Sequence, residues 1–454
     1  MPFNNKSYAK IALTITIFLT MLILAVSCKE CPSEPEPNSC IFISAEEVFC
    51  TWLILKVNFS SSDNPNHFLI KRNDEIIANS TFKNVDTLIT DRFLKPNTDY
   101  NYRAYFLKDN MVKDSSDELT IHTVLPSSHE MTWILDTLGS GDNSTFLTDV
   151  AIIDKNDAWV VGEIYTEDTY TYDSLGVWQD PYNAAHWDGN KWELVRIEAE
   201  FGSDIISPPV RSIFAFSEDD IWANFGYPVH GDGEKWTFYH LYNMGVCESS
   251  IVGCWGTSSS DMYFVGESGT IVYYNGSEFE LMDSGTDHYL RSVAGTKGIV
   301  WACGHDSWTG SNDMVEYRNQ KWDKKEFSPG ISIGDFEEVR AFSDYLYLAG
   351  NSELYIESAL TGNYNTIVWS WINPDHQDGE YYSYTGMEIN SFNDIFLSCG
   401  CGRIYHYNGE TLYRYPIQLE QTMSDIGVRG DFVVAVGATI MNGNIRGIVV
   451  RGYR

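Results

Sequence analysis

Residues 255–271 read WGTSSSDMYFVGESGTI, and the core of this phrase recurs along most of the chain. A full copy has an aspartate, an aromatic residue two positions later, a short apolar run and a closing glycine. Seven copies occur, at residues 157–162, 220–226, 261–266, 301–304, 347–350, 394–400 and 431–437. A phrase that returns at such regular spacing indicates a protein built from repeated supersecondary units.

A second phrase follows most copies, in which a strand and a turn lead to a strand that opens with an aromatic residue. Examples are HWDGNKW at residues 186–192 and YYNGSEF at residues 273–279. Asp-Gly and Asn-Gly favour two-residue hairpin turns, because both central residues need positive φ. Each unit is therefore expected to be a four-stranded meander. Residues 129–454 allow about 46 residues per unit, which is the size of a β-propeller blade.

The seventh unit provides only three strands before residue 454. Residues 130–137, at the start of the repeat region, carry Trp133 in the place where other fourth strands open with an aromatic side chain. We predict that residues 130–137 form the missing outer strand of the seventh unit. This pairing would close the ring and remove an exposed sheet edge.

The sequence of residues 255–271 closely resembles the repeats of bacterial secreted propellers that are often described as glucosyl-hydrolase-like or sialidase-like. The resemblance implies an all-β fold, with a seven-bladed β-propeller over residues 129–454. It does not extend to catalysis. Asp188-Gly189 and Asp232-Gly233 lack the residue that sialidase boxes place between Asp and Gly, and no Phe-Arg-Ile-Pro segment occurs. No catalytic residue is transferred.

Residues 40–126 carry short alternating runs separated by polar turns, which predict a small β-sandwich. This region resembles a fibronectin type III domain in its Leu-x-Pro-x-Thr-x-Tyr pattern, formed by Leu94, Pro96, Thr98 and Tyr100. In that family the tyrosine packs inward at a strand corner and its hydroxyl satisfies nearby backbone. Trp52 matches the core tryptophan of the second strand. We expect this domain to act as a spacer.

Residues 1–27 have the layout of a secretory signal, with Lys6 and Lys10 ahead of a mainly apolar run at 11–26. The run ends in Ser27-Cys28, which resembles a bacterial lipobox and implies that Cys28 carries lipid. Residues 28–39 are an acidic, Pro-rich tether. The alternative is an uncleaved anchor with an incidental cysteine. We expect a lipid-anchored protein of the bacterial cell envelope. The expected location is the outer membrane, with the protein either periplasmic or surface-exposed.

Acidic residues outnumber basic ones by 63 to 30, which gives a net charge of −33. Removal of residues 1–27 would make it −35. This charge argues against nucleic acid as a partner, and against membrane contact other than through a lipid anchor, because both need a basic surface. We expect an envelope protein or a glycan as the partner, and a monomer.

Catalytic and metal motifs are missing from the sequence, since neither a Gly-x-Ser-x-Gly elbow nor a His-Glu-x-x-His helix occurs. No cofactor is expected. Residues 154–157 (DKND) could suggest calcium, but the same aspartate recurs in other units, which favours a turn.

Insertions on a repeat scaffold often carry the residues that bind a ligand. Two insertions are rich in aromatic residues, and the candidate ligand-binding residues are Tyr165, Tyr170, Tyr172, Trp178, Tyr182, Trp369, Trp371 and Tyr382. The alternative is that these rings pack between units.

Eight cysteines follow Cys28, and an oxidising compartment would permit disulfides between them. Cys40 and Cys50 flank an expected hairpin and are the preferred pair. Cys247 and Cys254 are a second possibility. Cys399-Gly400-Cys401 could mimic a metal or redox pair, but strand-end thiols are favoured there.

These features predict a non-catalytic protein- or glycan-binding platform held at the cell envelope. One alternative is a secreted glycoside-active enzyme, and another is a structural component of envelope assembly. Carboxylates gathered about 5–10 Å apart in the centre of the propeller, with a perturbed pKa, would favour the enzyme.

Overall fold

The computed structural model describes residues 40–60, 67–81, 86–233, 235–306, 310–325, 336–350, 353–358, 367–369, 383–417, 419–420 and 422–454. The chain divides into two compact units, with the boundary between Val124 and Leu125. The expected signal and tether, residues 1–39, lie outside the described residues. None of the described residues forms a helix with the length and apolarity needed to cross a bilayer.

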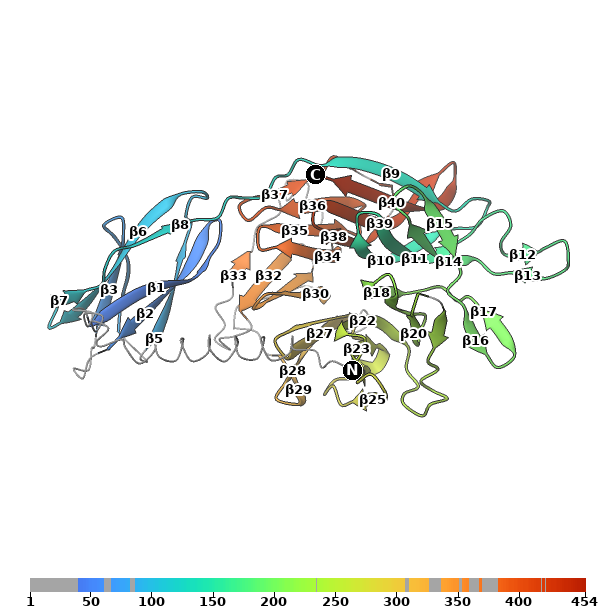
Figure 1. The fold of residues 1–454 in the computed structure, drawn as a ribbon, viewed down its shortest axis with the longest axis horizontal. Helices are drawn as coiled ribbons and strands as arrows, with labels where there is room; N and C mark the ends of the chain where they lie inside the picture. The colour runs from blue at the N-terminus through green and yellow to red at the C-terminus, as the bar shows by residue number, and fades with distance from the viewer. Residues whose placement is uncertain are drawn as a thin grey trace, which may run out of the picture. The chain divides into compact units, whose positions relative to one another are not determined.

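Two antiparallel sheets make up the first unit (Figure 1). One has the order β1-β2-β5, with β1 (Ile41–Val48), β2 (Trp52–Phe59) and β5 (Asp86–Arg92). The other has the order β4-β3-β6-β7, with β8 also paired to β6, and comprises β3 (His67–Arg72), β4 (Glu75–Ser80), β6 (Asp99–Lys108), β7 (Met111–Ser115) and β8 (Leu119–His122). Both sheets contribute to one apolar core, because Leu53 of β2 and Phe68 of β3 belong to the same buried cluster.

Tyr100 behaves as the family resemblance implies. Its hydroxyl accepts a hydrogen bond from the backbone N–H of Lys95 at 2.8 Å. Leu94 is buried beside this corner, and Trp52 is also buried, stacked on Phe49 with ring centroids 3.6 Å apart. The expected role of the tyrosine hydroxyl is therefore confirmed at the level of this hydrogen bond.

The described residues of the second unit form seven four-stranded antiparallel sheets, which we number one to seven in chain order. Sheet one consists of β10 (Phe146–Asp154), β11 (Asp157–Ile164), β14 (Tyr182–Trp187) and β15 (Trp192–Val195), and sheet two of β18 (Ser212–Ser217), β19 (Asp220–Asn224), β20 (Pro228–Gly231) and β21 (Trp236–Phe238). Sheet three consists of β22 (Ile251–Ser258), β23 (Asp261–Gly266), β24 (Ile271–Tyr274) and β25 (Phe279–Met282), and sheet four of β26 (Ser292–Thr296), β27 (Ile299–Asp306), β28 (Ser311–Arg318) and β29 (Lys321–Lys324). Sheet five consists of β30 (Phe336–Phe342), β31 (Tyr345–Gly350), β32 (Glu353–Ser358) and β33 (Ile367–Trp369), and sheet six of β34 (Tyr384–Ser391), β35 (Asp394–Cys399), β36 (Arg403–Tyr407) and β37 (Leu412–Arg414). Sheet seven consists of β38 (Met423–Arg429), β39 (Phe432–Met441), β40 (Asn444–Tyr453) and β9 (Thr132–Leu138). Two small hairpins, β12 (Thr171–Tyr172) with β13 (Trp178–Gln179) and β16 (Ala199–Phe201) with β17 (Asp204–Ile206), and a 3₁₀ turn η1 (Glu267–Gly269) complete the unit.

The first strand of each sheet is its inner strand. Inner strands of successive sheets contact one another, and β10 also contacts β38, so the contacts run round a closed ring. Apolar side chains fill the space between neighbouring sheets; for example, Trp301 of sheet four and Leu348 of sheet five share one buried cluster. The all-β, propeller-like arrangement therefore follows from the repeated phrase, whose apolar run forms the buried second strand.

The ring closes through β9, as the sequence predicts. β9 pairs with β40 in antiparallel register, from Leu138 opposite Gly447 to Thr132 opposite Tyr453. Trp133 lies over Gly452, where an added Cβ would approach the indole to 2.5 Å. A glycine is therefore required opposite this tryptophan.

The turns between third and fourth strands correct one expectation. Trp187 pairs with Trp192 and Tyr274 pairs with Phe279, so these loops contain four residues rather than two. Only the glycine of each loop has positive φ, at 89° for Gly189 and 91° for Gly276. The Asp188 carboxylate accepts the backbone N–H groups of residues 190 and 191, both at 2.8 Å. The aspartate side chain therefore caps the loop by accepting backbone N–H groups within it.

Candidate functional site

A cavity of about 760 Å³ lies along the axis of the ring and is lined by all seven inner strands. Strands alternate in direction within each sheet. The connections from second to third strand, and from each fourth strand to the next sheet, therefore lie at the face where the inner strands begin. We call this the entry face. The connection that carries β12–β13, the connection that carries β16–β17 and the Cys399–Cys401 turn all emerge there.

One equivalent position from each inner strand forms a polar ring around the cavity. Each of these residues pairs with a residue one or two positions before the closing glycine of the repeated phrase, as Asp149 does with Val161 and Asp425 with Val436. The seven residues of this polar ring are Asp149, Ser212, Gly253, Ser292, Glu338, Gly386 and Asp425. In four of the five copies that begin with an aspartate, at 157, 220, 261 and 394, the ring residue lies eight positions earlier, and in the copy that begins at Asp431 it lies six positions earlier. Sequence reasoning missed this offset, which would have located four members of the ring.

Asp149 and Asp425 share a hydrogen bond across the junction of sheets seven and one. Burial raises the pKa of Asp425 well above its usual value, and the charge and hydrogen bond of Asp149 raise it further. Both carboxylate oxygens of Asp149 accept backbone hydrogen bonds: Oδ1 accepts the N–H of Val150 at 2.7 Å, and Oδ2 accepts that of Ile213 at 2.8 Å. A similar link joins sheets four and five, where the Ser292 hydroxyl donates to Glu338 at 2.7 Å. The polar ring therefore fastens neighbouring inner strands together.

Arg340 occupies the next layer of the cavity. Its guanidinium contacts Glu338, and its Nε lies 3.4 Å from Oε2 of Glu388. Burial alone would lower the pKa of Arg340, but the surrounding carboxylates, with Glu388 first among them, raise it. Two further arginines stand where inner strands begin. Arg291 lies 2.7 Å from Glu337, and Arg211, 48% exposed, lies 3.8 Å from Glu267. The lining therefore includes paired charges that suit a polar ligand.

The raised pKa of Asp425 gives a prediction about pH. Because its folded-state pKa is raised, the stability that this carboxyl contributes is fully present below the ordinary value of about 3.9 and is lost as pH rises through the folded-state pKa. Asp425→Asn is neutral at every pH and should therefore remove this loss. Urea unfolding at about pH 5 and about pH 8 should show a smaller decrease in unfolding free energy for Asp425→Asn than for the wild type. Equal decreases would show that the pair does not share a proton.

The structure separates the predicted aromatic binding residues into three groups. Tyr170, Tyr172 and Trp178 are exposed by 57%, 67% and 42%. Tyr165 and Tyr182 are partly buried: the Tyr165 hydroxyl donates to Glu163 at 2.7 Å, and the Arg196 guanidinium stacks 4.2 Å from the Tyr182 ring. The third group was expected in the connection between sheets five and six, but Trp369 belongs to the fourth strand of sheet five. Trp369 lies in β33 with its side chain not described, and Trp371 and Tyr382 lie outside the described residues.

The recurring aspartate has a structural partner. Asp157 accepts from His186 at 2.9 Å, Asp220 from His230 at 2.9 Å, and Asp394 from His406 at 2.8 Å, each histidine lying on the third strand of the same sheet. At residues 154–157, Asp154 Oδ1 accepts the N–H of Asn156 at 2.6 Å, which is a turn interaction. Within the described residues no group of three His, Cys, Asp or Glu side chains is placed to hold a metal ion.

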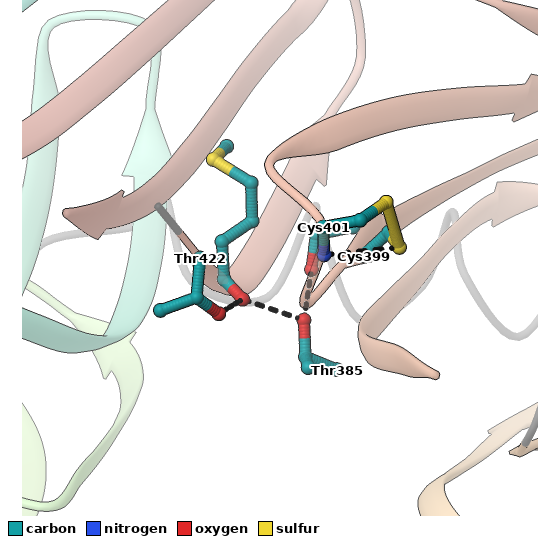
Figure 2. The surroundings of a disulfide bond; sticks show 6 residues. Thr385, Cys399, Cys401 and Thr422 are labelled. Carbon is teal, nitrogen blue, oxygen red and sulfur yellow. Dashed lines mark hydrogen bonds between the residues drawn. A yellow bond between two sulfur atoms is a disulfide. The ribbon is translucent and has the colours of Figure 1, made fainter. Parts of the chain in front are cut away.

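Cys399 and Cys401 form a disulfide at the entry face, with their Cα atoms 5.1 Å apart (Figure 2). The expectation of strand-end thiols there is wrong. Beside it, the Thr385 and Thr422 hydroxyls each donate to the carbonyl of Met423 at 2.8 Å, and both threonines line the cavity. The disulfide thus braces the turn next to the cavity entrance.

The two preferred cysteine pairs are also wrong, since among described residues no disulfide joins Cys40 to Cys50 or Cys247 to Cys254. Cys40 and Cys50 stand at opposite ends of β1, roughly 25 Å apart at 3.3 Å per residue, far beyond disulfide reach. Cys254 instead faces the Ser212 hydroxyl at 3.6 Å, and burial raises the pKa of its thiol to about 12.

Together these features define an all-β, propeller-like protein with an axial cavity. No protein-family model matches the chain, and no curated protein matches it. Among solved structures, YCF48 bound to D1 peptide is 14% identical, with 72% of this chain and 99% of that chain covered and a TM-score of 0.49. YCF48 from Cyanidioschyzon merolae is 12% identical, with 70% and 98% covered and a TM-score of 0.46. An auxiliary nutrient binding protein from Bacteroides thetaiotaomicron is 12% identical, with 91% and 99% covered and a TM-score of 0.35. At these values the likenesses carry no functional argument, and function is inferred from the site.

Proposed function

We propose that this chain is a non-catalytic binding protein of the bacterial cell envelope, which recognises an envelope protein or a glycan at the entry face of a seven-bladed β-propeller. The axial cavity carries the proposal, because all seven inner strands line it and several of them contribute charged side chains, among them Asp149, Arg340 and Glu388. The inserted hairpins and the Cys399–Cys401 turn emerge at the entry face, and loops on one face of a repeat scaffold often carry its binding residues.

The first unit is a fibronectin type III spacer in this proposal. The hydrogen bond from Lys95 to the Tyr100 hydroxyl and the two-sheet core support that assignment. Cys28 would carry the lipid, and residues 28–39 would tether the domains outside the membrane. Mass spectrometry of the mature chain tests the anchor, because an acylated N-terminal Cys28 is expected.

The test of the binding site is a variant that fills the cavity. Val252 lines the cavity on the inner strand of sheet three and is partly exposed. The ligand is to be identified by capture from native envelope extracts and by a glycan array, then titrated calorimetrically. Val252→Trp should weaken its affinity at least about tenfold, since the indole occupies ligand volume. Arg211→Ala, at the entrance, should weaken it less.

Val112→Trp provides the matched control, because Val112 is 57% exposed on β7 of the first unit. This variant adds the same side chain away from the cavity and should bind as the wild type does. Unchanged affinity in Val252→Trp would place the ligand elsewhere and contradict the proposal.

A glycoside-active enzyme is favoured by one observation, the raised pKa of Asp425 inside the cavity. The two carboxylates are hydrogen-bonded to each other, whereas glycosidase pairs stand about 5–9.5 Å apart to admit a sugar or a water. Both oxygens of Asp149 also accept backbone N–H groups, so neither is presented to a substrate. Turnover of a chromogenic glycoside that Asp425→Asn abolishes would establish the enzyme and overturn the binding proposal.

A further inference from the structure

An exposed aromatic surface lies on the hairpin that joins β11 to β14. We call residues 163–182 the aromatic hairpin; Figure 1 shows its strands β12 and β13 projecting from the second unit. Tyr172 and Trp178 are a cross-strand pair with ring centroids 5.1 Å apart, and the Tyr170 ring is also 5.1 Å from Trp178. The three rings meet edge to face and are 42–67% exposed. They therefore form one continuous aromatic surface in water.

The hairpin is held in this shape before any partner binds. The Asp173 carboxylate accepts the N–H groups of Leu175 at 2.9 Å and Val177 at 2.8 Å, which fixes the tip. At the base, the Arg196 guanidinium donates to the carbonyl of Asp180 at 2.9 Å. A preorganised aromatic surface loses little entropy on binding. Its three exposed rings belong to none of the buried clusters around sheet one, and other aromatic residues of the repeat fill the space between sheets.

The aromatic hairpin is also strongly acidic. Residues 163–182 contain five carboxylates, Glu163, Glu167, Asp168, Asp173 and Asp180, and no lysine or arginine. None of the five makes a salt bridge with a lysine or arginine in the described part of the chain. The second hairpin on the entry face, β16–β17, repeats the composition, since Phe201 is 49% and Ile205 63% exposed and residues 198–206 contain three carboxylates without a basic residue.

We propose that the aromatic hairpin docks a cationic segment of a partner protein, whose lysine or arginine side chains lie over the Tyr172 and Trp178 rings while the carboxylates face the same charges. Aromatic faces attract cations through their quadrupole, and unpaired carboxylates steer a basic partner toward them. A neutral glycan would use the rings but gain nothing from the charge. The surface is separate from the axial cavity, so this proposal stands or falls independently of the cavity ligand.

The experiment compares three probes on the full chain by biolayer interferometry: an Arg/Gly/Ser peptide, a Glu/Gly/Ser peptide of equal length, and maltoheptaose. The basic peptide should bind at least about tenfold more tightly than either other probe, and more weakly as salt is raised. The double variant Tyr172→Ala/Trp178→Ala should reduce its affinity about tenfold. This variant removes no charge, so it separates the aromatic surface from general attraction to a chain of net charge −33.

Phe93→Ala is the matched control, because Phe93 is 96% exposed in the first unit and should leave binding unchanged. Tyr172→Arg is a second variant that keeps a large side chain at the site and should also weaken binding, because its positive charge repels the basic peptide. Val252→Trp should leave the peptide affinity intact, which separates this surface from the cavity. Maltoheptaose binding that exceeds peptide binding, or equal peptide affinity in wild type and Tyr172→Ala/Trp178→Ala, would overturn the proposal.

Discussion

Deleting residues 129–138 is expected to lower the melting temperature of the second unit by more than about 10 °C. The deletion removes β9, which pairs with β40 at every residue from Thr132 to Leu138. Leu138 is buried, and Trp133 packs against the cluster that holds Ile448 and Val450. Loss of one such large side chain costs about 3–5 kcal/mol, and each kcal/mol shifts the melting temperature by about 2–4 °C in a domain of about 150–250 residues and by less in a larger one.

The same deletion breaks a polar link between the ends of the ring. Asp136 pairs with the Arg451 guanidinium, whose Nη2 lies 3.1 Å from Oδ1, and Asp136 Oδ2 also accepts the Trp192 indole N–H at 3.0 Å. The Arg451 side chain stacks over the Trp187 ring at 3.9 Å. Without β9, β40 therefore becomes the outer edge of sheet seven, and Trp192 of sheet one loses its hydrogen-bond partner Asp136.

A length-matched control separates strand pairing from the connection between the units. Replacing residues 129–138 with ten Gly and Ser residues keeps the connection but removes every side chain of β9. Differential scanning calorimetry should show nearly the same decrease for the replacement and for the deletion. Trp133→Ala alone should show an intermediate decrease. A melting temperature unchanged by the deletion would mean that β9 does not hold the ring closed.

The repeated phrase made the fold predictable because it fixes strand polarity and burial together. The aspartates at 157, 261 and 394 begin β11, β23 and β35, and the apolar residues that follow them are buried. Trp133 placed the closing strand, because an aromatic residue opens the fourth strand elsewhere. These inferences succeeded where one local pattern determines one element.

The site was less predictable because it depends on contacts between sheets. Asp149 and Asp425 are 276 positions apart in the sequence, and only ring closure brings them together. The cysteine pairs failed for a related reason. Cys40 and Cys50 were placed beside a turn by composition, but the register of β1 with β2 sets Cys40 near Ser60 instead. The spacing of two cysteines in the sequence does not show at which end of a strand each of them lies.

Asp394→Ala should destabilise the protein by about 3–5 kcal/mol, because it removes the acceptor at the centre of a buried cluster. The Asp394 carboxylate is 3% exposed. It accepts from His406 at 2.8 Å, from Arg454 Nη1 at 2.7 Å and from Asn390 at 2.7 Å. Burial alone would raise the pKa of Asp394, but these hydrogen bonds, with Arg454 foremost, lower it overall. The carboxylate is therefore ionised and strongly held.

The matched control is Asp157→Ala, at the same place in the repeat. Asp157 is more exposed and its carboxylate has His186 as its hydrogen-bond partner, so the loss should be about 1 kcal/mol. The difference between the variants measures what Arg454 and Asn390 add. Because the folded-state pKa of Asp394 is lowered, its stabilisation is present above the ordinary carboxyl pKa and is lost as pH falls through the folded value. Urea unfolding at neutral pH should therefore show the larger loss for Asp394→Ala, and the two variants should converge in acid. Equal losses at neutral pH would show that the cluster around Arg454 adds nothing to the repeat's own Asp–His pair.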